Sequence, residues 1–288
     1  MTEEEPPRKV RKVQESLRIK VIPILGRQFT CEAVPSTPFE ALKLENKRVI
    51  GQIICRLKEL PEELQHLKRV EKDGSVLISK SRKLAEQLVA DLAHPDVRLE
   101  DLRTVQVPAI KPLTRRQFEF AKNLWATGFH PDHEIERLLD GSFLTSSFRE
   151  YVFRWIQKAL EMKDGCVAVQ NDVQLSSGRP SAHPLGHPTM EMIGSLPKRT
   201  DHSTDYLGTG ADVFLATEPC AMCAMALVHF RAKRIFFARP TENGVLSEGG
   251  WQLHLDASIN HHYDVFRVEI PEEINNFSNF SVFCKNSD

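Results

Sequence analysis

Two cysteines and one histidine in the second half of the sequence have the residue types and spacing of a zinc site. Cys220 and Cys223 follow Pro219 in the segment PCAMC. Two thiolates three residues apart can bind one zinc ion, but a structural site usually adds a second Cys/His pair, and the sequence has no second C-x-x-C. We expect His187 to be the third ligand. Three protein ligands leave one coordination position open, which is typical of a catalytic zinc.

A histidine followed downstream by Pro-Cys-x-x-Cys is the metal-binding pattern of the zinc deaminases. A thioredoxin-like redox pair shares the C-x-x-C spacing, but the aromatic-Cys-Gly-Pro context of such pairs is missing here. His183 is a rival for His187 as the third ligand. Pro184 and Pro188 make one continuous helix carrying both histidines improbable, and Pro184 also occupies the Glu position of an HExxH zinc motif.

The acid that a deaminase needs is missing from its expected position. In the deaminase pattern, Glu stands two residues after the zinc histidine and moves protons between the zinc-bound water and the base. Here that residue is Thr189, which has no carboxylate. Glu191 lies four residues after His187 and is the one substitute that we consider. The motif therefore predicts zinc binding without turnover.

The elements that must position these residues alternate between strand and helix in the second half of the chain. An apolar stripe predicts a helix over 147–163, and Asn171-Asp172 predicts a turn between two strands. Such an alternation is typical of a mixed or parallel sheet covered on both faces. The further expected strands are 166–169, 173–175, 211–216 and 233–237, and the further expected helices are 187–193 and 219–230.

The first half predicts a smaller α+β domain over residues 18–100, after a charged arm, 1–17, that we expect to be disordered. The pattern favours a strand over 19–25 and the start of a helix over 38–43, and it leaves 47–57 undecided between the two. The Asp-Gly pair at residues 73–74 predicts a hairpin of strands 68–71 and 75–79, and residues 81–92 have a helical period. Residues 101–146 are expected to form a connector with a helix from Thr114, and 147–288 a second domain.

The composition sets limits on function and location. The chain has 288 residues, of which 41% are hydrophobic and 27% charged, as in globular proteins. The sequence contains no run of about 18 apolar residues, which a membrane-spanning helix would need. The N-terminus lacks the apolar region of a secretory signal. Six cysteines with a single close pair indicate a reducing compartment, so we expect the protein in the nucleus and cytoplasm.

Charge is unevenly distributed along the chain. Residues 1–116 contain 23 Lys and Arg against 17 Asp and Glu, whereas the remainder contains 15 and 22. The basic half is therefore the better candidate for a nucleic-acid contact. The basic cluster of Arg8, Lys9, Arg11 and Lys12 is typical of a nuclear signal or an RNA-contacting arm.

On these motifs, the chain resembles the non-catalytic subunit of the eukaryotic heterodimeric tRNA adenosine deaminase, a member of the cytidine/deoxycytidylate deaminase superfamily. That enzyme makes inosine at the wobble position, 34, of tRNA anticodons. The most specific stretches are PLTRRQF and EPCAMCAMALVH, within residues 107–130 and 217–237. The segments 64–74, 184–190 and 253–266 support them. Thr189 fits the family's replacement of the catalytic Glu, although Pro188 and Thr189 differ from the small residue followed by Val that the family leads us to expect.

The resemblance implies a fold, a cofactor and partners. The fold would be α/β, with a cytidine-deaminase-like three-layer α/β/α domain with a mixed sheet, preceded by the smaller α+β domain. The chain would hold Zn²⁺ at a pseudo-active site, pair with a catalytic deaminase subunit that bears the acid, and bind the anticodon arm and body of tRNA, with no membrane partner. The basic residues that fit tRNA contacts are Lys68, Arg69, Lys72, Lys80, Arg82, Lys83, Arg115 and Arg116.

Two other functions fit the sequence. The chain could be a self-sufficient nucleoside or base deaminase that uses Glu191, or a non-enzymatic RNA-binding scaffold with a structural zinc. At the C-terminus, Cys284 or the carboxylate of Asp288 could cap the open zinc position.

Overall fold

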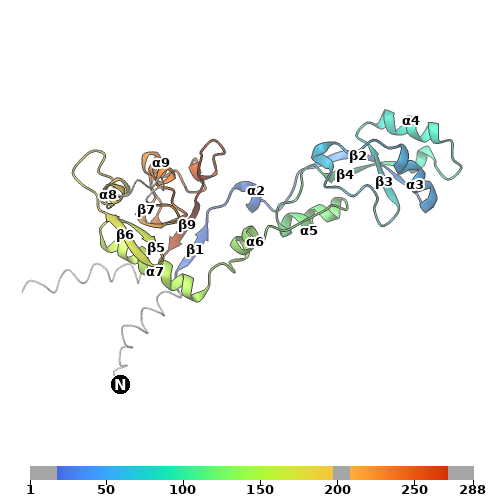
Figure 1. Ribbon diagram of the computed structural model, residues 1–288. Helices are drawn as coiled ribbons and strands as arrows, with labels where there is room; N and C mark the ends of the chain where they lie inside the picture. Colours follow the sequence, from blue (N-terminus) through green and yellow to red (C-terminus); the bar gives the residue numbers. More distant parts are fainter. Residues whose placement is uncertain (1–17, 197–207, 272–288) are drawn as a thin grey trace, which may run out of the picture. The chain divides into compact units, whose positions relative to one another are not determined.

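The computed structural model describes residues 18–196 and 208–271, which fall into two compact units. Of the described residues, the larger unit comprises 18–25, 141–196 and 208–271, and the smaller unit comprises 26–140. Both are drawn in Figure 1. The charged arm over 1–17 and the C-terminal residues Cys284 and Asp288 lie outside the described residues.

A six-stranded mixed sheet is the centre of the larger unit. The strand order is β1-β9-β8-β7-β5-β6. Strands β7, β8 and β9 are parallel to one another, whereas β5 is antiparallel to both β6 and β7, and β1 is antiparallel to β9. The strands span Lys20–Pro23 (β1), Cys166–Gln170 (β5), Val173–Gly178 (β6), Asp212–Thr217 (β7), Arg234–Arg239 (β8) and Asp264–Glu269 (β9).

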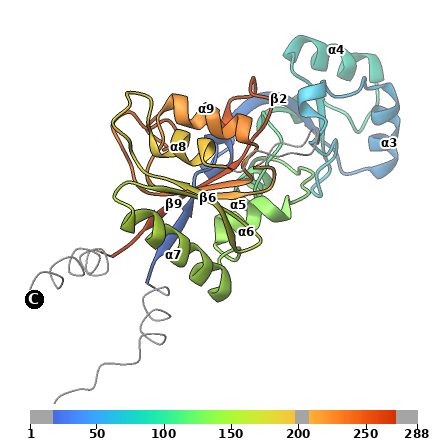
Figure 2. The ribbon, with the colours of Figure 1, turned by 60° about the vertical axis from the view of Figure 1, so that its left-hand side comes forward.

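Helices cover both faces of this sheet, as Figure 2 shows. Helix α7 (Ser146–Glu161) lies on one face, and α8 (Pro188–Gly194) and α9 (Ala221–Phe230) lie on the other. Successive side chains of β7 point to opposite faces of the sheet. Val213 and Leu215 belong to the core under α9, whereas Phe214 contacts the ring of Tyr151 in α7. The predicted three-layer α/β/α domain with a mixed sheet is therefore confirmed.

Local sequence signals explain where these elements begin and end. Thr145 caps α7 because its hydroxyl accepts a hydrogen bond from the Phe148 amide at 3.2 Å. Asn171 and Asp172 both have positive φ, 51° and 62°, as a tight two-residue hairpin turn requires. The 3-10 helix η3 (Leu253–Leu255) completes the described elements of the larger unit.

A polar network stands out on the α7 face of the sheet. Asp212 is buried at the start of β7, and Arg234 at the start of β8 donates to it at 2.7 Å. The Tyr151 hydroxyl donates to the same carboxylate at 2.8 Å, and the Arg234 guanidinium lies over the Phe148 ring at 4.8 Å. These contacts compensate for the burial of the Asp212 charge and join α7 to two adjacent strands.

The smaller unit is built on a three-stranded antiparallel sheet in the order β3-β2-β4. Leu42, Val76 and their neighbours form one apolar core with α3 and α4, while Phe39, Leu77 and Trp125 belong to a second core. The strands are Ser36–Lys43 (β2), Ser75–Ser79 (β3) and Leu102–Pro108 (β4). The helices are Arg27–Thr30 (α2), Lys47–Arg56 (α3), Arg82–Leu92 (α4), Arg115–Leu124 (α5) and His133–Asp140 (α6), with 3-10 turns at Glu62–Leu64 (η1) and Leu99–Asp101 (η2).

Two local predictions in the smaller unit were wrong. Residues 38–43 belong to the central strand β2 and not to a helix. The four consecutive residues 39–42 are buried because cores cover both faces of this strand, which removes the period-2 signal of a half-buried strand. Residues 68–71 do not form a full strand either: Val70 makes a single bridge to Val76 next to the turn at Gly74, whose φ is +85°.

The two units also divide the chain differently from the expected domains 18–100, 101–146 and 147–288. The segment 20–23 belongs to the larger unit, because β1 pairs with β9 at the edge of its sheet. Most of the expected connector belongs to the smaller unit, because β4 pairs with β2 and α5 packs on β4. Within the described ranges, no helix has the length and apolar character needed to cross a membrane.

Candidate metal centre

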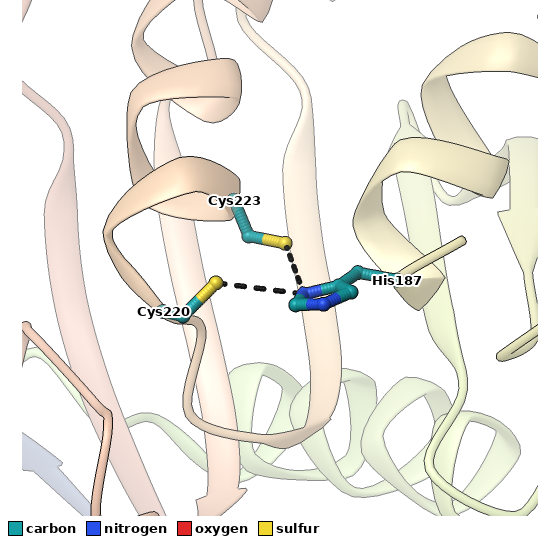
Figure 3. A group of neighbouring side chains, drawn as sticks. All are labelled: His187, Cys220 and Cys223. Carbon is teal, nitrogen blue, oxygen red and sulfur yellow. Dashed lines mark hydrogen bonds between the residues drawn. The ribbon is translucent and has the colours of Figure 1, made fainter. Parts of the chain in front are cut away.

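The three predicted metal ligands come together at the N-terminal ends of two neighbouring helices. His187 immediately precedes α8, Cys220 immediately precedes α9, and Cys223 lies in the first turn of α9. The imidazole Nδ1 atom of His187 lies 3.5 Å from the Cys220 sulfur and 3.4 Å from the Cys223 sulfur. Figure 3 shows both thiols facing one nitrogen atom of the ring.

The local sequence explains why the ligands converge. Pro188 is at the first position of α8, where its missing N–H costs no hydrogen bond. Gly178 in β6 lets α8 approach the sheet, since a Cβ atom there would lie 2.1 Å from the Pro188 carbonyl oxygen. Helix α9 begins directly after β7, and α8 and α9 pack against each other. The two helix starts are thus held together by the core beneath them.

The ligand set and its spacing fit zinc. One imidazole and two thiols are the donors that zinc prefers, and all three ligand atoms lie within 4.8 Å of one another. Zn–S bonds of about 2.3 Å and Zn–N bonds of about 2.0–2.1 Å at tetrahedral angles separate a nitrogen from a sulfur by about 3.6 Å. The two nitrogen–sulfur distances, 3.5 and 3.4 Å, are close to this separation. The three residues therefore form a possible metal site.

Thr189, at the position where a deaminase has its acid, is buried beside the sulfurs. Its side chain is 1% exposed. Burial raises the pKa of the Cys223 thiol to about 12, the neighbouring Cys220 sulfur adds to this rise, and a hydrogen bond from Thr189 opposes it. Burial also raises the pKa of the Cys166 thiol, again opposed by a hydrogen bond from Thr189. Thr189 therefore lies next to these two thiols, and its hydroxyl is not a carboxylate of the kind that moves protons in a deaminase.

A cavity of 230 Å³ opens beside the three ligands. Its lining includes Thr189, Thr217 and the carboxylate residues Asp164, Glu218 and Glu242. Asp164 forms an ion pair with Arg239. Glu242 is exposed.

Glu218 organises the loop that lines this cavity. The residue is 4% exposed, and its carboxylate accepts hydrogen bonds from the amides of Leu246 and Ser247 at 2.8 and 2.7 Å and from the Ser247 hydroxyl at 2.7 Å. Gly244 passes so close that a Cβ atom there would lie 2.2 Å from the carboxylate. We did not predict a role for Glu218, although its place directly before Pro219-Cys220 was a usable signal.

The two residues that competed for roles near the metal lie elsewhere. Glu191 accepts a hydrogen bond from the Ser181 hydroxyl at 2.7 Å and is absent from the cavity lining. His183 is exposed, and its Nδ1 atom accepts from the Leu185 amide at 3.1 Å. Neither belongs to the cluster of ligand atoms. The geometry favours His187 as the third ligand and removes Glu191 from the reacting position.

The predicted tRNA-binding residues all lie in the smaller unit, but their side chains differ in what they contact. Several are engaged by acids: Lys80 pairs with Glu63 at 3.2 Å, Arg82 with Glu40 at 3.1 Å and with Glu86 at 2.8 Å, and Arg116 with Glu32 at 3.3 Å. Arg69 donates to the carbonyl oxygens of Lys58 and Leu77, so it braces the backbone. Among the described residues, the side chains of Lys68, Lys72, Lys83 and Arg115 have no acidic partner.

Comparison with known proteins gives relatives along most of the chain, although no family model matches it. The probable inactive tRNA-specific adenosine deaminase-like protein 3 of Rattus norvegicus is 28% identical over 88% of this chain and 90% of its own length. The tRNA-specific adenosine deaminase subunit TAD3 of Saccharomyces cerevisiae is 23% identical over 73% of this chain and 76% of its own. The tRNA-specific adenosine deaminase TAD3 of Arabidopsis thaliana is 53% identical over 68 residues, 24% of this chain and 17% of its own.

One solved structure, from studies of A-to-I editing by tRNA:A34 deaminases, aligns with 42% of this chain and 97% of its own at 21% identity. Its TM-score of 0.31 is too low to carry an argument. These sequence relatives come from an animal, a plant and a yeast, and all three names refer to tRNA-specific adenosine deaminase. The resemblance predicted from the sequence is therefore confirmed: this chain is a homologue of proteins named TAD3 or probable inactive tRNA-specific adenosine deaminase-like protein 3.

Proposed function

We propose that this chain is the non-catalytic, zinc-binding subunit of a tRNA adenosine-34 to inosine deaminase, which contributes tRNA binding and stabilises a catalytic partner. The observation that carries the proposal is the combination of three converged metal ligands with a buried threonine at the acid position. A deaminase site needs both a metal and a proton-transfer group. Here the residues that could bind the metal are present, and the residue that would transfer protons is replaced by Thr189.

His187, Cys220 and Cys223 would hold the zinc. In an active deaminase, a zinc of this kind supplies an activated water to the base. In this chain the ligands would instead brace the starts of α8 and α9, since His187 immediately precedes α8, Cys220 immediately precedes α9 and Cys223 lies in the first turn of α9. Metal binding of this kind contributes directly to the stability of the fold.

The need for a partner follows from the missing acid and from the surface of α9. Leu227 of this helix is fully buried in the core, as are Ala224 and Val228. Met222 and Met225 remain partly exposed, although Met225 also packs against this core. A helix that is apolar on its outer side as well is suited to contact another protein. The names of the yeast relatives, which are called subunits, support the same proposal.

The closest rival function is a self-sufficient deaminase. The contact between Glu191 and Ser181 weighs against Glu191 as the acid. Glu242 is the other acid to test, because it lines the cavity and, among the described residues, has no cationic partner. A chain that deaminates alone would lose activity on Glu191→Gln or Glu242→Gln, whereas our proposal expects no activity to lose.

Co-expression with a candidate catalytic subunit, followed by an inosine assay on tRNA, tests the proposal. We expect no inosine from this chain alone on tRNA, an anticodon stem-loop, adenosine or cytidine, and inosine at position 34 when both subunits are present. His187→Ala should lower the yield of active complex. Activity of the purified chain alone would overturn the proposal, and tRNA binding without any partner-dependent inosine would favour the scaffold alternative.

A further inference from the structure

A groove in the smaller unit lies between the segment 66–72 and helix α5. It encloses 660 Å³, which is within the range of small-molecule sites. Its lining residues come from both sides and include three lysines, an aromatic ring and two neutral polar side chains: Lys68, Lys72, Phe118, Lys122, Asn123 and Thr127. The groove is separate from the candidate metal centre, which belongs to the larger unit.

Backbone hydrogen bonds hold the two walls of the groove in place. The Lys68 amide donates to the Ala126 carbonyl oxygen at 2.8 Å, and the Gly128 amide donates to the His66 carbonyl oxygen at 2.7 Å. The indole Nε1 atom of Trp125, a residue that is 3% exposed, donates to the Lys68 carbonyl oxygen at 2.7 Å. The shape of the groove is therefore set by the fold before any ligand binds.

The groove has lysine side chains that are available to bind an anion. Lys68 and Lys72 are exposed and have no acidic partner among the described residues. Lys122 pairs with Glu119. The one carboxylate in the lining, that of Glu71, accepts a hydrogen bond from the Ala126 amide at 2.5 Å, so it is turned toward the backbone. By contrast, Lys80 and Arg82 at the start of α4 are already paired with acids.

An aromatic ring lies beside these lysines. Phe118 is partly exposed in the groove lining and is stacked on Phe129, with ring centroids 5.0 Å apart and an angle of 12° between the planes. Lysines next to an aromatic ring are the combination that binds single-stranded nucleic acid, in which the cations contact phosphates and the ring contacts a base. Protein recognition of RNA uses unstacked bases in this way.

We propose that this groove binds an unpaired segment of the RNA substrate, with phosphates at Lys68 and Lys72 and a base against Phe118. This inference rests on the proposed function, because it takes tRNA as the ligand. Of the eight basic residues predicted from the sequence to bind tRNA, it assigns two, Lys68 and Lys72, to one site. It also adds Phe118, Lys122 and Asn123, which the basic pattern did not include.

Binding of tRNA by the full chain, alone and with its catalytic partner, tests the groove. The variant is Lys68→Ala/Lys72→Ala, and the matched control is Lys80→Ala/Lys83→Ala, which removes the same charge from the same unit. Losing two phosphate contacts should reduce the slope of log K against log salt by about 1.4. The affinity ratio of wild type to variant should therefore be about sevenfold smaller at 200 mM than at 50 mM salt. The control should keep a slope closer to that of wild type.

Phe118→Leu separates stacking from charge. It keeps an apolar side chain against Phe129, so we expect the fold to be retained and tRNA binding to weaken by about tenfold with an unchanged salt slope. Equal slopes for wild type and Lys68→Ala/Lys72→Ala, or an equal loss in the control, would overturn the groove. Absence of inosine from the wild-type complex would instead overturn the proposed function, so the two failures are distinguishable.

Discussion

If the site holds zinc, as we propose, His187→Ala should remove the stabilisation that the metal gives to the larger unit. The imidazole supplies the only nitrogen ligand of the cluster, and its Nδ1 atom is 3.4 and 3.5 Å from the two sulfurs, close to the separation of about 3.6 Å in a tetrahedral zinc site. Without it, only the two cysteines at the start of α9 remain, and the proposed metal would no longer link α8 to α9. We expect the variant to bind zinc much more weakly than the wild type.

The size of the effect follows from mass action. At a free zinc concentration one hundred times the dissociation constant, binding to the folded state adds about 2.7 kcal/mol to the free energy of unfolding. For a unit of 150–250 residues, about 2–4 °C of Tm corresponds to 1 kcal/mol. The wild-type Tm should therefore rise by about 5–11 °C between chelator and zinc. The Tm of His187→Ala should change by about 2 °C or less.

Thermal unfolding with zinc and with EDTA measures this shift, and elemental analysis of the purified chain gives the metal content. His183→Ala is the matched control, because it removes the rival histidine, which is exposed and outside the ligand cluster. It should keep the zinc-dependent shift. The reasoning is refuted if His187→Ala keeps the full shift, or if His183→Ala loses it.

Three further predictions concern groups around the site. Glu191→Gln should leave partner-dependent inosine formation unchanged, since its carboxylate accepts from Ser181 and is not in the cavity lining; a large loss of rate would restore Glu191 as a candidate acid. Tyr151→Phe should lower the free energy of unfolding by about 1.5 kcal/mol in urea, because the hydroxyl donates to the buried Asp212 carboxylate. Burial lowers the pKa of His254 below 6.5, so the unfolded chain binds its proton more readily and stability is lost as pH falls below 6.5; His254→Gln should flatten the decline between pH 7.5 and 5.5.

Much of the larger unit could be predicted because its signals are local. The apolar stripe of α7, the Asn171-Asp172 turn and the Pro-Cys start of α9 each determine an element within a few residues. The position of β1 could not be predicted in the same way. Residues 20–23 look like an ordinary N-terminal strand, and only their pairing with β9, far away in the chain, assigns them to the larger unit.

In the candidate metal centre, too, the residues that form a short local pattern could be predicted, whereas those whose role depends on distant contacts could not. The ligands were predictable from type and spacing, since Cys220, Cys223 and a helix-opening histidine form a short pattern. The role of Glu218 depends on a loop that folds back over it from residues 241–247, so the sequence offered only its adjacency to the motif. The contacts of the basic residues were the least predictable from the sequence. Their sequence clustering cannot reveal that Arg82 is paired with two acids whereas Lys68 is unpaired among the described residues.

At the candidate metal centre, the three metal ligands of the deaminase pattern are present and its acid is replaced by threonine. This combination suggests why the chain would bind a metal. The three ligands are the residues that zinc requires for its own binding, whereas the acid of a deaminase is not a zinc ligand. Thr189 fills the position of that acid with a buried side chain that lies next to the thiols of Cys166 and Cys223. The site therefore has the residues that would link α8 to α9 through a metal and has threonine at the acid position, as expected if, as we propose, the metal serves the fold and the acid comes from a partner.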